Sequence, residues 1–136
     1  MPRFFPGLET ASAFRSPPTG LTTMIKVKRI YEPPDRDDGF RVLVDRIWPR
    51  GVRKDEARID LWLKDVAPST ELRRWFGHDP AKWTEFCRRY RAELKQQADA
   101  LAMLRNRAEG HVVTLVYAAR DPEHNNAAAL SKVLRA

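Results

Sequence analysis

The stretch FRVLVDRIWPRG, residues 40–51, decides the fold. Its apolar run Val42-Leu43-Val44 lacks the alternation of a half-buried strand, so it predicts a strand over residues 40–47 that is covered on both faces. Strands of this kind are typical of the centre of a parallel sheet. Pro49 and Gly51 end the strand, because proline lacks a ladder donor and glycine permits a positive φ in the exit turn.

Two further strands flank this centre in the sequence. Residues 25–31 alternate apolar and polar side chains and predict an outer, half-buried strand. Residues 112–118 are apolar except for Thr114 and predict a buried strand. The turn-rich segment 32–39 is too short for a helical crossover, so the first two strands either form a hairpin or do not pair directly.

Helices are predicted between and after these strands. Ser69 is a good N-cap for a short helix ending at residue 76, and Asp79 with Pro80 has the form of a second helix start. Gly110 ends that second helix. A break near Gln97 could divide it into two helices. One apolar stripe identifies it, at three- and four-residue spacing: Trp83, Phe86, Cys87, Tyr90, Leu94, Ala98, Leu101 and Leu104. Residues 126–134 predict a closing helix.

These elements predict a small three-layer α/β domain over residues 24–136, with a mostly parallel sheet of three or four strands flanked by helices. A chain of 136 residues is long enough for one hydrophobic core. Residues 1–23 are rich in proline and glycine without periodicity and predict a disordered extension.

Composition narrows the classes of function. No stretch approaches the roughly 18 apolar residues of a membrane span, and a single cysteine excludes an intramolecular disulfide and fits a reducing, cytoplasmic setting. The net charge of +7 favours anionic partners, either a small anionic ligand or nucleic acid. The sequence contains no glycine-rich phosphate loop, G-x-G-x-x-G or G-x-S-x-G motif, so triphosphate hydrolysis, dinucleotide redox chemistry and serine esterase chemistry lose support.

Polar clusters follow two of the predicted strands, at residues 45–51 and 120–126. Since ligands bind beyond the carboxyl ends of strands in open α/β sheets, parallel strands would bring both clusters to one edge. The candidate catalytic residues are Asp45, His78 and His124, the first as a base or nucleophile and the histidines for proton transfer. The candidate substrate-binding residues are Arg46, Trp48, Arg50, Asp121 and Asn125.

Each candidate also has a structural interpretation. Asp45 could form a salt bridge with Arg41, Arg46 or Arg50, and His78 could cap a helix. No two histidines have the short spacing of a metal motif, so neither a metal nor another cofactor is expected. Cys87 lies on the apolar stripe, where it is expected to pack with a raised thiol pKa rather than to act as a nucleophile.

Four segments together resemble a known family: RVLVDRIWPRG at 41–51, APSTELR at 67–73, WFGHDP at 75–80 and residues 117–126. The chain resembles the YeaO-like branch of domain-of-unknown-function family 488. The resemblance implies a compact bacterial α/β protein without assigning a reaction. More distant relatives often have a cysteine and a histidine in the final turn, where this sequence has Asn125 and Asn126, which weakens a thiol mechanism.

Three hypotheses for function follow. The first is an enzyme acting on a small anionic or nucleotide-derived substrate at the shared strand edge. The second is a nucleic-acid-binding module that uses the tryptophans and the basic loop of Arg50, Arg53, Lys54 and Arg58. The third is a structural or interaction protein whose polar residues are all locally paired. The sequence does not determine the oligomeric state.

Overall fold

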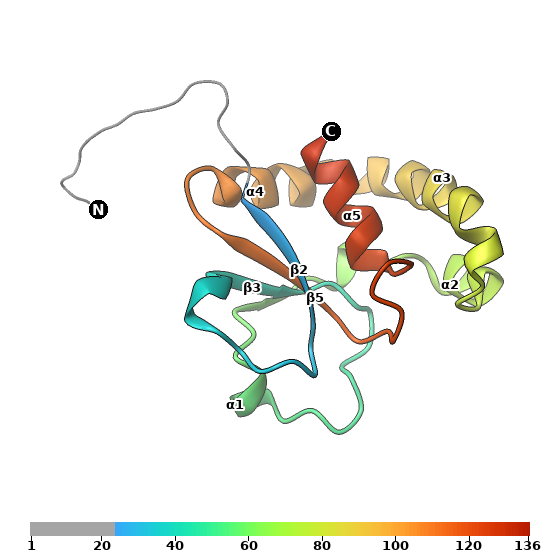
Figure 1. Ribbon diagram of the computed structural model, residues 1–136. Helices are drawn as coiled ribbons and strands as arrows, with labels where there is room; N and C mark the ends of the chain where they lie inside the picture. The colour runs from blue at the N-terminus through green and yellow to red at the C-terminus, as the bar shows by residue number, and fades with distance from the viewer. Residues whose placement is uncertain (1–23) are drawn as a thin grey trace.

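A parallel sheet of four strands forms the centre of the computed structural model, which describes residues 24–136 (Figure 1). The predicted disordered extension, residues 1–23, lies outside the described residues. The sheet order is β2-β5-β3-β4, and every pairing in it is parallel. The strands are β2 (Ile25–Arg29), β3 (Phe40–Leu43), β4 (Leu61–Trp62) and β5 (Val113–Tyr117).

The apolar run after Phe40 lies in the middle of this sheet. Val42, Leu43 and Val44 are fully buried, which confirms the predicted strand covered on both faces. The predicted outer strand is at the sheet edge as β2, and β5 lies between β2 and β3. A hairpin between the first two strands is therefore excluded, and the alternative of non-adjacent strands is correct.

Helices cover one face of the sheet. They are α2 (Thr70–Phe76), α3 (Trp83–Leu94), α4 (Ala98–Ala108) and α5 (Asn126–Arg135). Figure 1 shows α3 and α4 running in line, with α5 beside them over the sheet. The 3-10 turn Lys95–Gln97 separates α3 from α4, which confirms the predicted break. The stripe of α3 is buried at Phe86, Tyr90 and Leu94, so its spacing predicted the buried face correctly.

An irregular segment with one helical turn, α1 (Lys54–Ala57), covers the opposite face. A second, smaller core lies beneath it, where Leu43 and Val116 pack with the indoles of Trp48 and Trp62. The sequence pattern did not predict α1 or β4, because neither element is long enough to show a hydrophobic period. The three layers are present, and one outer layer is mainly loop.

The amino-end edge of the sheet is held by a buried ion cluster. Asp38 is fully buried and its carboxylate contacts Arg41 at 2.6 Å and Lys28 at 3.0 Å. Burial alone would raise the pKa of Asp38, but hydrogen bonds from the Asp35 backbone, Lys28 and Arg41 lower it to about 2. Arg41 therefore pairs with Asp38 and not with Asp45, which corrects one of the salt bridges considered above.

Helix α2 is fixed at its start by the predicted cap. The Ser69 hydroxyl accepts a hydrogen bond from the Leu72 backbone N–H and donates one to Glu93 on α3. The Glu93 carboxylate also accepts from the Ser69 backbone N–H. This contact holds α2 against α3. Within residues 24–136 no helix is long and apolar enough to cross a membrane.

Candidate functional site

Asp45 joins three elements at the carboxyl-end edge of the sheet. Its two carboxylate oxygens accept hydrogen bonds from the Ala118 backbone N–H and the Asn126 side-chain amide, each at 3.0 Å. The Asn126 amide also donates to the Val44 carbonyl. Because β3 and β5 are parallel neighbours, with Leu43 opposite Val116, the two polar clusters meet at one edge, as the sequence predicts.

A pocket of about 210 Å³ opens at this edge, between the strand ends and helices α2 and α3. We call it the strand-end pocket. It contains five of the eight candidate residues, together with Arg73 and Asn126, which were not among the candidates. Its polar lining residues are Asp45, Arg46, Arg73, His78, His124, Asn125 and Asn126.

The walls of the strand-end pocket are largely apolar. Phe76 of α2 and Phe86 of α3 line it, with ring centroids 4.4 Å apart. Ala118 and Ala119 supply the wall that follows β5. Ile47, which also lines the pocket, is 63% exposed. The pocket thus combines apolar walls with a few polar groups, which is the usual composition of a small-molecule site.

The environment of Asp45 raises its pKa. Burial of the half-buried side chain is the main cause, and it outweighs the hydrogen bonds from Asn126 and Ala118 and the positive charge of Arg73, which act in the opposite direction. Each carboxylate oxygen has two acceptor positions, so both retain capacity for a further donor.

Arg46 and Arg73 bring positive charge to the strand-end pocket. Both residues are exposed. The Arg46 guanidinium donates to the carbonyls of Ala67 and Pro68 at 3.3 and 3.5 Å. Within residues 24–136 neither arginine forms a salt bridge. The salt bridge considered between Asp45 and Arg46 is therefore not formed, and the guanidinium groups keep donors for an anion.

His124 is held by a neighbouring carboxylate. Its Nδ1 lies 2.8 Å from Asp121 Oδ2, and its ring meets the Trp83 indole edge-on at a centroid distance of 5.2 Å. Asp121 also accepts from the backbone N–H groups of Glu123 and His124; these bonds and the His124 ring lower the pKa of Asp121. Asp121 does not line the strand-end pocket and instead orients His124.

His78 reaches the pocket from the loop after α2. It follows Gly77 and has a positive φ of 58°, a backbone conformation that few residues other than glycine adopt. It is exposed and its ring lies 6.3 Å from Phe76. No cap involving the His78 side chain is found, since Asp79 caps the following turn.

Asn125 has a structural role within the site. Its side-chain oxygen accepts from the Ala128 backbone N–H and so caps α5, while its amide donates to the Asp121 carbonyl. It is buried. These two hydrogen bonds position the start of α5, and Asn125 also lines the strand-end pocket.

Trp48 and Arg50 do not line the strand-end pocket. The Trp48 indole donates to the Val52 carbonyl and packs edge-on against Trp62, in the smaller core. The Arg50 carbonyl accepts from the Tyr31 hydroxyl. The turn at Pro49 carries the chain to the opposite face of the sheet, which sequence proximity to Asp45 did not reveal.

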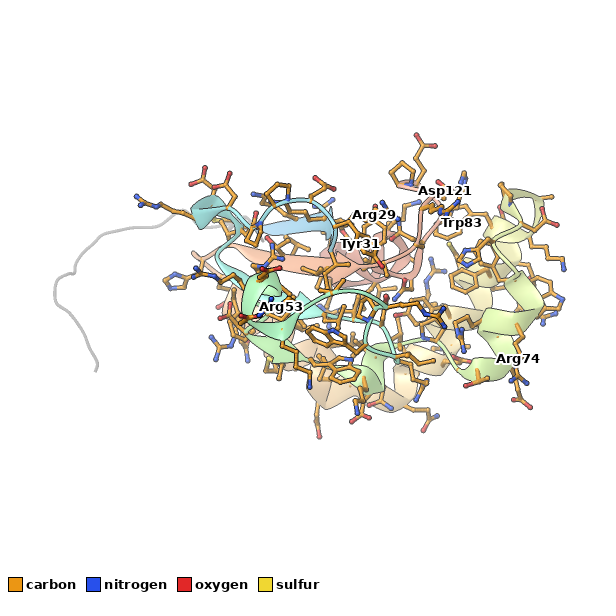
Figure 2. The ribbon with its side chains drawn as sticks, turned by 90° about the horizontal axis from the view of Figure 1, so that it is seen from below. Arg29, Tyr31, Arg53, Arg74, Trp83 and Asp121 are labelled. Carbon is orange, nitrogen blue, oxygen red and sulfur yellow. The ribbon has the colours of Figure 1, made fainter. Side chains whose placement is uncertain are left out.

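The basic loop proposed for nucleic acid lies on the α1 side. Figure 2 shows Arg53 there, well separated from Trp83 and Asp121. Arg53 pairs with Asp55 at 3.4 Å, and Lys54 lies over the Trp48 ring. All four tryptophans are half-buried, so they offer less stacking surface than this hypothesis expects.

The remaining candidates have little support as reactive groups. Cys87 packs against the main core, and burial raises its thiol pKa. Among the residues that the structure describes, no three His, Cys, Asp or Glu side chains gather as a metal site would require. Glu85 pairs with Arg88 and Arg89 at 2.6 and 2.8 Å on the solvated face of α3.

Arg73 and Asn126 are the polar lining residues that were not predicted from the sequence. Arg73 had a signal, because it lies at the fourth position of the helix that Ser69 caps, one turn before Phe76. Its direction depends on how α2 packs against α3, which spacing along the chain does not specify. Asn126 follows Asn125 in the final turn, and only the parallel strand arrangement places it beside Asp45.

The fold and the site define a small parallel α/β domain with a pocket at the carboxyl ends of its strands. The chain belongs to the family described as "Inactive DUF488-N3 subclade", whose model matches residues 24–136. This confirms the resemblance to the YeaO-like branch. It is 52% identical over 112 residues to "Uncharacterized protein Rv3073c" of Mycobacterium tuberculosis, covering 82% of this chain and 94% of the relative. It is 40% identical over 111 residues to "Uncharacterized protein YeaO" of Escherichia coli, covering 82% and 96%. No solved structure matches.

Proposed function

We propose that this protein binds a small organic anion in the strand-end pocket and does not convert it covalently. The observation that carries the proposal is the placement of two arginines without carboxylate partners among residues 24–136 beside an apolar pocket at the ends of parallel strands. The net charge of +7 would raise the local concentration of anions around the molecule.

Binding is favoured over catalysis by the groups that line the pocket. None of them is Ser, Thr, Cys or Lys, so the pocket lining offers no hydroxyl, thiol or amine nucleophile. Asp45 has a structural role, because its two oxygens accept hydrogen bonds from Ala118 and Asn126 and so join β3, β5 and α5. The family description, with the word "Inactive", supports the same choice. The enzyme hypothesis, with Asp45 as base and the histidines moving protons, therefore has less support.

Calorimetric titration and thermal shift with four probes test the proposal. The probes are inorganic phosphate, acetate, benzoate and adenosine monophosphate at matched ionic strength. An anion that binds the folded protein raises its melting temperature by mass action. Arg73→Gln should weaken binding about tenfold, because hydrogen bonds to charged groups are worth roughly 1.5–3 kcal/mol.

Arg74→Gln is the matched control. Arg74 is also exposed and lies on the same helix, α2, away from Asp121 in Figure 2, and it does not line the strand-end pocket. Its replacement removes the same charge and should leave binding unchanged within the error of the titration. An equal loss of binding affinity in Arg73→Gln and Arg74→Gln would contradict the proposal. So would the absence of binding by any of the four probes.

The nucleic-acid hypothesis predicts a different result in the same assays. A single-stranded oligonucleotide would bind with an affinity that falls steeply as salt rises, and Arg53→Gln would weaken it more than Arg73→Gln. Oligonucleotide binding that survives Arg73→Gln, without binding of the small anions, would favour that hypothesis over the pocket.

A further inference from the structure

The size of the strand-end pocket limits what it can enclose. Its volume is about 210 Å³, whereas an apolar cavity of about 150 Å³ is enough to hold benzene. One six-membered ring with two small substituents therefore fills it. A complete nucleotide would extend well outside it.

The shape of the walls favours a flat ring. Phe76 and Phe86 line the pocket, with ring centroids 4.4 Å apart and ring planes tilted by 31°. Aromatic rings favour offset-stacked or edge-to-face contacts with one another, so a third ring is a favourable neighbour for this pair. Ile47, 63% exposed at the same pocket, adds apolar surface that a bound ring would cover.

The polar groups are arranged in two zones. Asp45 is half-buried where β3, β5 and the start of α5 meet, and it is an acceptor with free capacity. Arg46 and Arg73 are exposed and are donors only. A ligand that satisfies both zones places a hydrogen-bond donor inside and an acid group outside.

We propose that the strand-end pocket takes a single-ring aromatic acid that carries an N–H or O–H donor on the side of the ring away from its carboxylate. The inner donor binds Asp45, the ring packs against Phe76 and Phe86, and the carboxylate binds Arg46 and Arg73. The assignment rests on the proposed function and narrows its ligand class. It also explains how the half-buried Asp45 carboxylate and a bound anion occupy one pocket, because the ring separates the two charges.

A series of four ligands on the unaltered protein tests the proposal by calorimetric titration. Para-aminobenzoate and para-hydroxybenzoate carry both groups, para-toluate has a methyl group in place of the donor, and para-toluidine lacks the acid. The two donor-bearing acids should bind about tenfold more tightly than para-toluate, as expected for a hydrogen bond to a charged acceptor. Para-toluidine should bind least tightly, since it loses the contact with both arginines.

Asp45→Asn supplies a second test, with its fold checked by circular dichroism. The variant should lose the preference for para-aminobenzoate over para-toluate, measured as the ratio of the two affinities. If the variant does not fold, the four-ligand series alone decides.

The outcomes separate the two proposals. Equal binding of para-toluate and para-aminobenzoate overturns the donor assignment and leaves anion binding in place. Adenosine monophosphate binding more tightly than all the ring acids overturns the single-ring assignment. Failure of every acid and of adenosine monophosphate to bind overturns the proposed function as well.

Discussion

Replacing Asp38 by asparagine should destabilise the protein by about 3 kcal/mol, because it leaves a buried arginine without its counter-charge. The Asp38 side chain is 1% exposed and that of Arg41 is 4% exposed, and they are in contact at 2.6 Å. Arg41 also donates to the carbonyl of Ala57, so the cluster ties β3 to α1. Asparagine keeps an acceptor oxygen but not the charge.

Urea unfolding followed by tryptophan fluorescence measures this change. The midpoint should fall while the slope stays the same, since the surface exposed on unfolding does not change. Arg53→Gln is the control, because the ion pair of Arg53 with Asp55 has both partners about 70% exposed and is worth about 0.5 kcal/mol or less. If Asp38→Asn loses no more free energy of unfolding than the control does, the buried ion pair does not stabilise the fold as argued.

The Asp38 carboxylate also makes the stability of the protein depend on pH. Its pKa is lowered from 3.8 to about 2 in the folded protein, so the unfolded chain binds the proton more readily. The stabilisation is complete above the ordinary pKa and is lost as the pH falls through 2, and it amounts to about 2 kcal/mol. The stability of Asp38→Asn should lack this acid-dependent step.

Three other predictions concern local chemistry. The pKa of Asp45 is raised in the folded state, so its contribution to stability is present in acid and lost as the pH rises through that pKa; carboxyl NMR titration should show it above the ordinary aspartate value. Gly39→Ala should cost more than about 2 kcal/mol, because an added Cβ would lie 2.3 Å from the Val112 carbonyl oxygen, whereas at Gly51 nothing lies within 4 Å; comparable unfolding midpoints would contradict this. Cys87 should react with thiol reagents more slowly than free cysteine, since burial raises its pKa; an equal rate would be inconsistent with its packing.

Hydrophobic patterns along the chain were sufficient to predict the centre of the sheet and the helical layer. An apolar run such as Val42 to Val44 is stable in a strand only where both faces of the strand are covered. The stripe through Phe86 and Tyr90 repeats over enough turns to define its buried face, and Gly110 follows the last turn of α4. These features depend on residues close in sequence, so the sequence alone contains them.

The site depended on contacts between distant residues and was predicted only in part. Parallel strands were sufficient to bring Asp45 and His124 to one edge, since both follow buried strands. Trp48 was misplaced because the turn after it reverses the face on which the indole packs. Arg73 was missed because its direction follows from α2 packing on α3. The two-residue strand β4 has no pattern of its own and forms only because β3 offers an edge.

An NMR titration of the ¹⁵N-labelled protein with benzoate tests the central claim most directly. If the strand-end pocket binds a small organic anion, the backbone amides of Arg46, Ala118 and Asn126 should shift in a saturable way, and Arg73→Gln should weaken the response while Arg74→Gln does not. Shifts confined to residues 50–58, or no saturable shift up to the solubility of benzoate, would contradict the account.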